Sequence, residues 1–268
     1  MENSKYYINI LKNSINNFKE VECKNCTYKT LICGNFGFCN VCELGFDIEQ
    51  NFLPEKSALE EISTFIGKGM IAEAVLSLDK LSKVATTPKL AYVLGVFYSL
   101  ISDYKYNDLN YARAGFMEEN SSNIYYSLDM VSKAKEQFYK TLTLISKSEN
   151  LGSDILYLNF ITNVRLKRSF YMLSSLKALN QNKTGEVYNN YANMVYAVLS
   201  KHKDTEKFIK PLINNELNTF YYASKHLYQN KKIDDSFFLL TELNSIARIP
   251  MAFYFSKKVE NIRSAIEI

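Results

Sequence analysis

The sequence has few of the residues that most often interrupt helices. Its 268 residues include only nine Gly and four Pro, too few for a chain built from many short strands and turns. The charged share is 22% and the hydrophobic share is 47%, a composition that excludes an intrinsically disordered chain. We therefore expect a folded, mainly α protein.

Long hydrophobic runs are also missing. The longest stretch covers 90–101, is interrupted by Ser99 and is bounded by Lys89 and Asp103, whereas a membrane-spanning helix needs about 20 apolar residues. Residues 1–20 carry scattered Lys and Asn and lack the apolar core of a signal peptide. These observations predict a cytoplasmic protein without a membrane span.

Common catalytic motifs are absent. The sequence contains no G-x-G-x-x-G, G-x4-G-K-[ST], G-x-S-x-G or H-E-x-x-H pattern. It has no Trp and two His, His202 and His226, both next to lysines that disfavour an imidazolium ion. Acid pairs such as 60–61, 118–119 and 234–235 are adjacent in sequence and diverge by about 100° on a helix. We predict a non-enzyme with no catalytic residues.

Against these absences, the cysteines are concentrated in one short segment. All five lie between positions 23 and 42, and four of them form two C-x2-C pairs, Cys23 with Cys26 and Cys39 with Cys42. Two such turns can direct four thiolates at one tetrahedral ion about 2.3 Å from each sulfur. Cys33 falls outside the pairs and is left out of the predicted ligand set. Disulfides and a redox C-x2-C are weaker alternatives, because no export signal and no thioredoxin-like setting are seen.

The residues around the cysteine pairs resemble a zinc ribbon. Residues 27–32 are strand-like, Gly34 and Gly37 mark a turn, and 44–48 offers a further strand. The resemblance covers about 21–48 and implies Zn²⁺ as the cofactor. Four thiolates leave no position for water, so this zinc would be structural. The Gly that usually follows each pair is replaced by Thr27 and Glu43.

The remainder of the chain shows helical spacing of apolar residues. Helices are predicted over 4–20, 57–66, 71–84 and from Pro88 to 101, with a break at Gly67-Lys68-Gly69. The helix–turn–helix–Pro unit resembles a tetratricopeptide repeat (TPR), with Gly69 at the turn, Ala74 at the small-residue position and Leu78 where the family has an aromatic residue. A second helix for the next unit is expected over 134–142, after an irregular insertion at 103–123.

A second copy of this unit is visible near the C-terminus. The positions of Ile71, Ala74 and Pro88 recur, with the same intervals between them, as Ile233, Ser236 and Pro250. Helices over 151–179 and 186–199 are expected between the two copies. The predicted fold is an α-solenoid of antiparallel helix pairs with a small zinc-ribbon β element, and a globular all-α bundle is its rival. The expected divisions are an N-terminal helix (1–20), the ribbon module (21–50) and the helical-repeat domain (55–268).

Charge is unevenly distributed along the chain. Residues 1–150 carry a net −2, whereas 151–268 hold sixteen basic and ten acidic residues. The basic excess falls in clusters at Arg165, Lys167 and Arg168, at 201–210, and at Lys225 with Lys231 and Lys232. The ribbon is neutral, and we expect its aromatic residues Tyr28, Phe36 and Phe38 to be exposed. This favours protein docking, or packing on the end of the solenoid, over phosphate binding.

Two functions are compatible with this pattern. The first is a protein-interaction scaffold whose helical groove binds a peptide or protein, with the ribbon as a docking cap. The TPR resemblance implies a role for Asn in holding peptide backbone, which points to Asn190 and Asn193. The alternative is a nucleic-acid-associated factor in transcription or translation that uses the ribbon and the basic C-terminal clusters.

Overall fold

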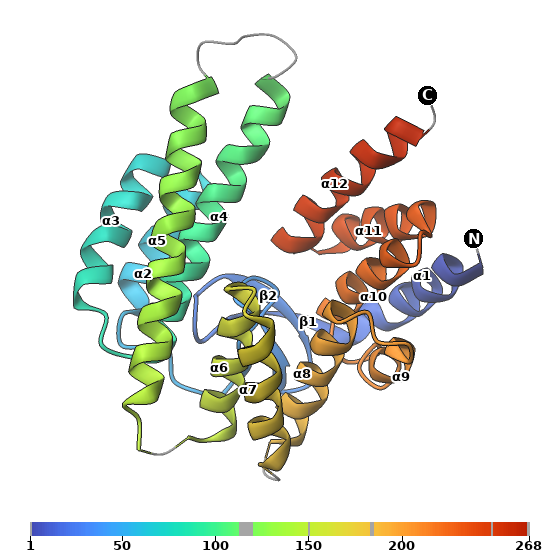
Figure 1. Ribbon diagram of the computed structural model, residues 1–268, viewed down its shortest axis with the longest axis horizontal. Coiled ribbons are helices and arrows are strands. Elements are labelled where there is room, and N and C mark those ends of the chain that lie inside the picture. The colour runs from blue at the N-terminus through green and yellow to red at the C-terminus, as the bar shows by residue number, and fades with distance from the viewer. Residues whose placement is uncertain (1, 113–119, 150, 183–184, 248, 267–268) are drawn as a thin grey trace.

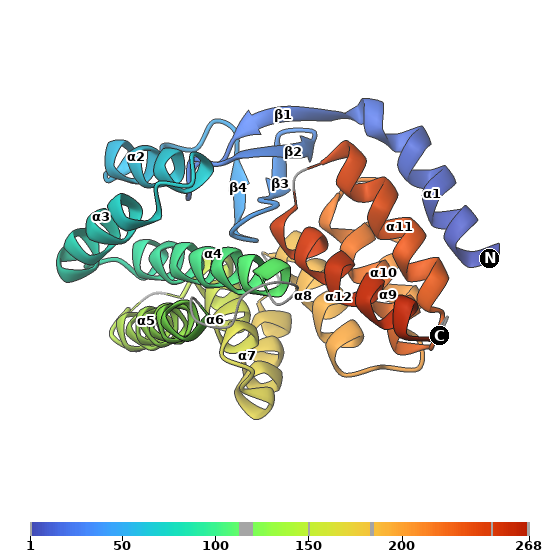
Figure 2. The ribbon, with the colours of Figure 1, turned by 90° about the horizontal axis from the view of Figure 1, so that it is seen from above.

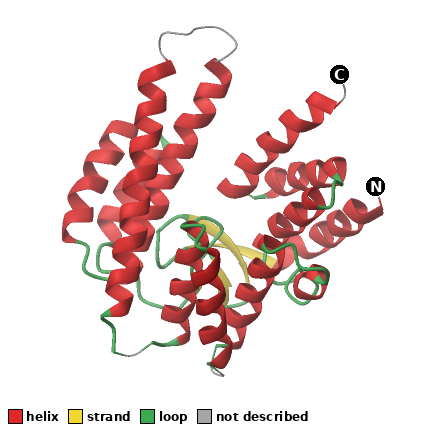
Figure 3. Cartoon of the chain, in the orientation of Figure 1, coloured by secondary structure: helices red, strands yellow, loops and turns green. Residues whose placement is uncertain are grey.

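The computed structural model describes residues 2–112, 120–149, 151–182, 185–247 and 249–266. The chain is mainly helical over these ranges, and four short strands lie near the N-terminus (Figure 3). The predicted mainly α fold class with a small β element is confirmed. In the described part of the chain, no helix is long and apolar enough to cross a bilayer.

The helices follow one another closely along the chain. They are α1 (Glu2–Ser14), α2 (Lys56–Gly67), α3 (Ile71–Val84), α4 (Pro88–Ala112), α5 (Asn120–Ser146), α6 (Ser153–Arg165), α7 (Ser169–Gln181), α8 (Glu186–Leu199), α9 (Thr205–Ile209), α10 (Asn218–Gln229), α11 (Ile233–Ile246) and α12 (Pro250–Ile266).

The N-terminal helix is shorter than the expected 1–20. Helix α1 ends at Ser14, a 3-10 turn covers Ile15–Asn17, and strand β1 (Phe18–Glu22) begins directly afterwards. Tyr7 and Leu11 are buried and hold α1 against the C-terminal helices α10 and α11. The helical prediction for 18–20 is therefore wrong, because these residues pair with a second strand instead.

The strands form two antiparallel hairpin-like pairs. Strand β1 pairs with β2 (Lys29–Cys33), with Phe18 opposite Cys33. Strand β3 (Phe36–Phe38) pairs with β4 (Gly45–Asp47), with Phe38 opposite Gly45. Each pair therefore encloses one C-x2-C turn, and the two turns face one another as the ribbon resemblance implies.

Two helical units have the same internal spacing along the chain. Helices α2 and α10 have equal lengths, as do α3 and α11, and the same short turns separate each of them from the next helix. The start of α12 thus follows α11 as the start of α4 follows α3. The paired positions Ala74 and Ser236 are both completely buried. A small residue is needed there because the helices of each unit approach closely.

The turns between paired helices share one backbone conformation. A residue with positive φ stands two positions after the end of α2, α6, α8 and α10; these residues are Gly69, Lys167, Lys201 and Lys231. The residue after each donates its N–H to a carbonyl five positions earlier, as in Arg168 to Asn163. This is the hydrogen bond of a helix-ending Schellman turn. Three of the four positions are lysines, so a glycine search alone finds only one of these turns.

Helices α4 and α5 are longer than the sequence indicated. The expected irregular segment 103–123 is helical up to Ala112 and again from Asn120, and its residues 113–119 lie outside the described ranges. Along their shared face, Gly95 lets the two helices approach closely, since an added Cβ would lie 2.6 Å from the Phe138 ring.

The helices surround the strands on several sides. Helices α2–α5 lie on one side, α10–α12 with α1 lie on the other, and α6–α8 close the space beneath (Figure 1). Viewed from above, the strands stand between the first and last groups (Figure 2). The strands therefore lie between the two groups of helices, with β1 along the outer edge of the molecule in this view.

Candidate metal centre

Four cysteines from the two turns converge on one point. The Sγ atoms of Cys23, Cys26, Cys39 and Cys42 all lie within 4.8 Å of one another, and all four residues are buried. The Sγ–Sγ distance is 3.9 Å between Cys23 and Cys42 and 3.5 Å between Cys26 and Cys39. A tetrahedral ion bound at about 2.3 Å requires sulfur–sulfur edges of about 3.8 Å. The geometry therefore fits one metal ion.

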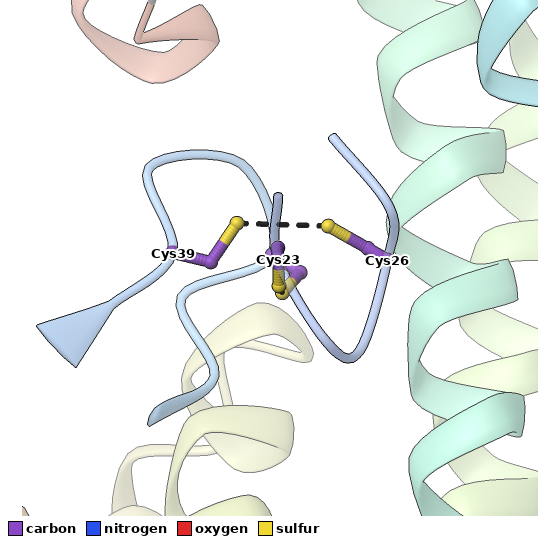
Figure 4. A group of neighbouring side chains, drawn as sticks. Cys23, Cys26 and Cys39 are labelled. Atoms are coloured by element: carbon purple, nitrogen blue, oxygen red, sulfur yellow. Dashed lines mark hydrogen bonds between the residues drawn. The ribbon is translucent and has the colours of Figure 1, made fainter. Parts of the chain in front are cut away.

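Figure 4 shows the Cys26 and Cys39 thiols turned toward one another between the two loops, with Cys23 beside them. All five cysteines are free thiols, and Cys33 is half-buried and outside the cluster. The separations of 3.5 and 3.9 Å are far longer than the roughly 2.05 Å of a disulfide bond.

The two turns are structurally equivalent. In the first, Thr27 donates its N–H to the carbonyl of Cys23, and Asn25 donates to the Cys23 sulfur. In the second, Glu43 donates to the carbonyl of Cys39, and Val41 donates to its sulfur at the same 3.4 Å. These N–H donors stabilise negative charge on the sulfurs, as a bound cation requires.

The two positions that usually hold Gly in a zinc ribbon have the positive φ that is typical of Gly. Thr27 has φ 64° and Glu43 has φ 60°, the left-handed region that L side chains rarely occupy. The substitution noted in the sequence therefore leaves the turn geometry intact. It adds backbone strain, which side-chain contacts at these positions have to offset.

The thiols of the cluster differ in pKa because their surroundings differ. Burial and hydrogen bonds with neighbouring thiols raise the pKa values of Cys26 and Cys42. Burial also opposes ionisation of Cys39, but hydrogen bonds from the other three thiols lower its pKa overall. A thiolate at this position suits metal binding, because the thiolate is the ligand form of cysteine.

The second turn is fixed to the helices through its backbone carbonyls. Tyr92 of α4 donates its hydroxyl to the Cys42 carbonyl at 3.0 Å, and Tyr157 of α6 donates to the Glu43 carbonyl at 2.9 Å. Asn218 of α10 donates its amide to the Cys39 carbonyl at 3.2 Å. Three separate helices thus hold the backbone that carries two of the four sulfurs.

A buried ion pair stands beside the same turn. The Glu43 side chain is 2% exposed and accepts from the Arg165 guanidinium at 2.7 Å and from the Tyr222 hydroxyl at 2.6 Å. Burial disfavours the charged form of Arg165, but electrostatic interactions with the Tyr92 hydroxyl and the Glu43 carboxylate raise its pKa further above the ordinary value. Arg165 was expected on an open basic surface, so its internal pairing is a correction to that expectation.

Aromatic rings of the ribbon are covered by α8. Phe38 stacks on Tyr191 with centroids 3.9 Å apart, and Phe36 meets Tyr188 edge-on. Gly45 is required beside them, since a Cβ there would lie 2.7 Å from the Tyr188 ring. Of the two uses expected for these rings, docking or packing on the helices, the structure shows packing against α8. Lys19, Glu20 and Lys29 of the β1–β2 hairpin remain exposed.

The other predicted binding residues lie at separate places. Lys167, Lys231, Lys232 and Asn190 are exposed, whereas Arg168 and Asn193 are partly buried. The Asn193 amide donates to the Asn180 side chain at 2.9 Å and to the Asn189 carbonyl at 2.7 Å. Both of its N–H groups are therefore used within the protein. Arg168 lies over the Tyr171 ring at 3.7 Å from its centroid.

The sequence did not predict that the two histidines line the same cleft. His202, in the turn after α8, and His226, in α10, line one cleft of about 480 Å³ together with Lys203, Lys207 and Lys210. The helix order gives no hint of this, because the short α9 and most of α10 separate the two rings along the chain.

The fold and the site define a mainly helical protein organised around a buried four-cysteine centre. Comparison of the chain with protein-family models, with curated proteins and with solved structures finds no match.

Proposed function

We propose that the chain is a non-catalytic scaffold protein whose helices are organised by a structural zinc ion. Cys23, Cys26, Cys39 and Cys42 would bind the ion, and its role would be to fix the two turns. The supporting observation is the buried, closed set of four sulfurs. A tetrahedral S4 site suits zinc or iron, and a fourth thiolate leaves no position for a reacting water.

The helical part fits a TPR-like solenoid curved around its own ribbon. The even-numbered helices α4, α6, α8 and α10 all contribute side chains to the ribbon contacts. Among these, α8 also touches α6 and α10, as first helices do in a stack of helix pairs. The ribbon then occupies the inner face, so a protein partner would dock elsewhere on the surface.

The outer face of α5–α7 has the chemistry of a protein interface. Phe170 is 78% exposed, Tyr171 and Tyr139 are about half exposed, and Arg168 lies over both tyrosine rings. Exposed aromatic residues with Arg are the groups that contribute most at interfaces. Lys167 next to them favours a partner segment that combines acidic and apolar side chains.

The zinc assignment is tested by metal analysis of the purified chain. We expect one zinc per molecule in the wild type and in Cys33→Ser, and less than about half an equivalent with loss of cooperative unfolding in Cys23→Ser. Iron in place of zinc, or equal metal content in the two variants, would contradict the assignment.

The interface is tested by affinity capture from the source cells with nuclease treatment in parallel. A protein retained by the wild type should be lost with Phe170→Ser. It should be retained with Phe253→Ser, which removes an aromatic ring that is 47% exposed on α12. Equal retention by the two variants would refute the assignment to α5–α7.

A further inference from the structure

Two basic clefts meet at the junction of α8, α9, α10 and α12. The first, described above, is lined by Lys201, Lys203, Lys207 and Lys210 with both histidines. The second, of about 460 Å³, is lined by Lys201, Lys225, Lys231 and Lys258. Lys201 and Gln229 line both clefts, so the two are neighbouring compartments of one surface, which we call the twin cleft.

The twin cleft concentrates the positive charge of the protein. It is lined by seven lysines and two acids, a formal +5, whereas the whole chain carries +4. Everything outside the twin cleft therefore sums to −1. A concave surface with charge of one sign raises the local concentration of ligands of the opposite sign.

The two acids leave the lysines available. Asp204 pairs with Lys207 at 3.4 Å and Glu206 pairs with Lys210 at 3.9 Å, all with side chains more than half exposed. Exposed pairs of this kind contribute little free energy. A phosphate group can therefore replace these carboxylates as the partner of Lys207 and Lys210.

The second compartment adds aromatic rings to the positive charge. Tyr228 and Phe255 line it and pack edge-on, with centroids 5.3 Å apart. The volumes of both compartments lie within the range of about 300–1,000 Å³ that is usual for ligand sites. Lysines that follow a backbone and rings that receive bases are the features of single-strand binding proteins.

We propose that the twin cleft binds a single-stranded nucleic acid, with phosphates on the lysines and a base against Tyr228 and Phe255. This goes beyond the scaffold role and does not depend on it, since none of the twin-cleft lysines belongs to the metal centre or to the α5–α7 face. The ribbon takes no part, because its aromatic rings are covered by α8. An acidic peptide would satisfy the lysines but would not use the rings.

The test is fluorescence anisotropy with labelled 12-nucleotide oligo(U) and oligo(dT) at 50–200 mM KCl. The site variant combines alanine substitutions at four exposed cleft lysines, Lys203, Lys207, Lys231 and Lys258. The matched control removes four exposed lysines elsewhere, Lys68, Lys80, Lys83 and Lys147. Circular dichroism melts establish that both variants fold.

We expect salt-dependent binding by the wild type, with a slope of about −0.7 per phosphate contacted. The site variant should bind about 100-fold more weakly at 50 mM KCl, with a slope shallower by roughly 3, and the control should stay within about twofold. Because stacking contributes about 1–3 kcal/mol per base, an abasic strand should bind at least about fivefold more weakly.

Absence of wild-type binding at 50 mM KCl, or equal weakening in site and control variants, would overturn the proposal. Polyglutamate that binds as tightly, with the same loss in the site variant, would assign the cleft to acidic peptides instead. An abasic strand that binds as well as oligo(U) would remove the role of the rings. A preference for either oligo(U) or oligo(dT) supports the site and shows which of the two strands it binds more tightly.

Discussion

Replacement of Glu43 by Gly should destabilise the protein, although it relieves backbone strain. Glu43 stands at φ 60°, and its counterpart Thr27 in the other turn stands at φ 64°. If backbone strain alone decided the outcome, Gly would stabilise the protein at both positions. The two sites differ in side-chain contacts, so they form a matched pair.

The magnitudes follow from those contacts. Relief of a left-handed conformation contributes about 1 kcal/mol at each site. Thr27 loses only a hydroxyl bond to the Cys26 carbonyl, so Thr27→Gly should lie between neutral and about 1 kcal/mol more stable. Glu43→Gly leaves Arg165 without its carboxylate, and breaking a buried pair costs about 3–5 kcal/mol. The net loss is about 2–4 kcal/mol.

Urea unfolding monitored by circular dichroism measures both changes. Zinc content is determined for each variant as a control. All four thiols remain in place, so both variants should keep the metal. The expected result is a lower urea midpoint for Glu43→Gly, with a melting temperature lower by about 10 °C, and an unchanged or higher midpoint for Thr27→Gly. Similar shifts in the two variants would refute the role assigned to the ion pair.

Three further predictions concern single buried positions. Burial raises the pKa of Glu216 to about 8, so stability should fall as pH rises from about 4.5 to 8, by up to about 5 kcal/mol. Glu216→Gln should flatten this dependence in urea titrations, and an unchanged profile would contradict it. The Ser236 hydroxyl is buried and has no hydrogen-bond partner among the described residues, so Ser236→Ala should stabilise by about 1 kcal/mol. The reciprocal Ala74→Ser should destabilise in the same assay. Gly95→Ala brings a Cβ within 2.6 Å of Phe138 and should cost about 1–3 kcal/mol, despite the better helix propensity of Ala; a melting temperature at or above wild type would contradict the close approach.

Local patterns in the sequence predicted the helices and the four-cysteine group. The spacing of Ile71, Ala74 and Pro88 and its repetition near the C-terminus indicated two matching units, and the helix bounds agree. The C-x2-C pairs indicated one S4 site, because the chemistry of thiolates leaves few other uses for two such turns. These features depend on neighbours within one or two helical turns.

Contacts between distant segments could not be predicted from the sequence. In the sequence, Arg165 belongs to a basic cluster with Lys167 and Arg168. Its contact with Glu43, 122 residues away, forms only in the folded chain. The packing of the ribbon's aromatic rings was left as one of two alternatives for the same reason, since a neutral, aromatic surface suits docking and internal packing equally. The strand at β1 was missed because its partner begins beyond the first cysteine turn.

The contacts around Glu43 also constrain the order in which the protein can be completed. All four sulfurs are present once Cys42 has been added to the growing chain, but Tyr222, which donates to Glu43, lies 179 residues after its acceptor. At a synthesis rate of about 5–20 residues per second, this interval lasts roughly 10–40 s. During that time the contacts of the second turn become available one after another, first from Tyr92, then from Tyr157 and Arg165, and last from Tyr222. Such distant contacts slow folding, so a metal ion bound early would preserve the template on which the later helices assemble.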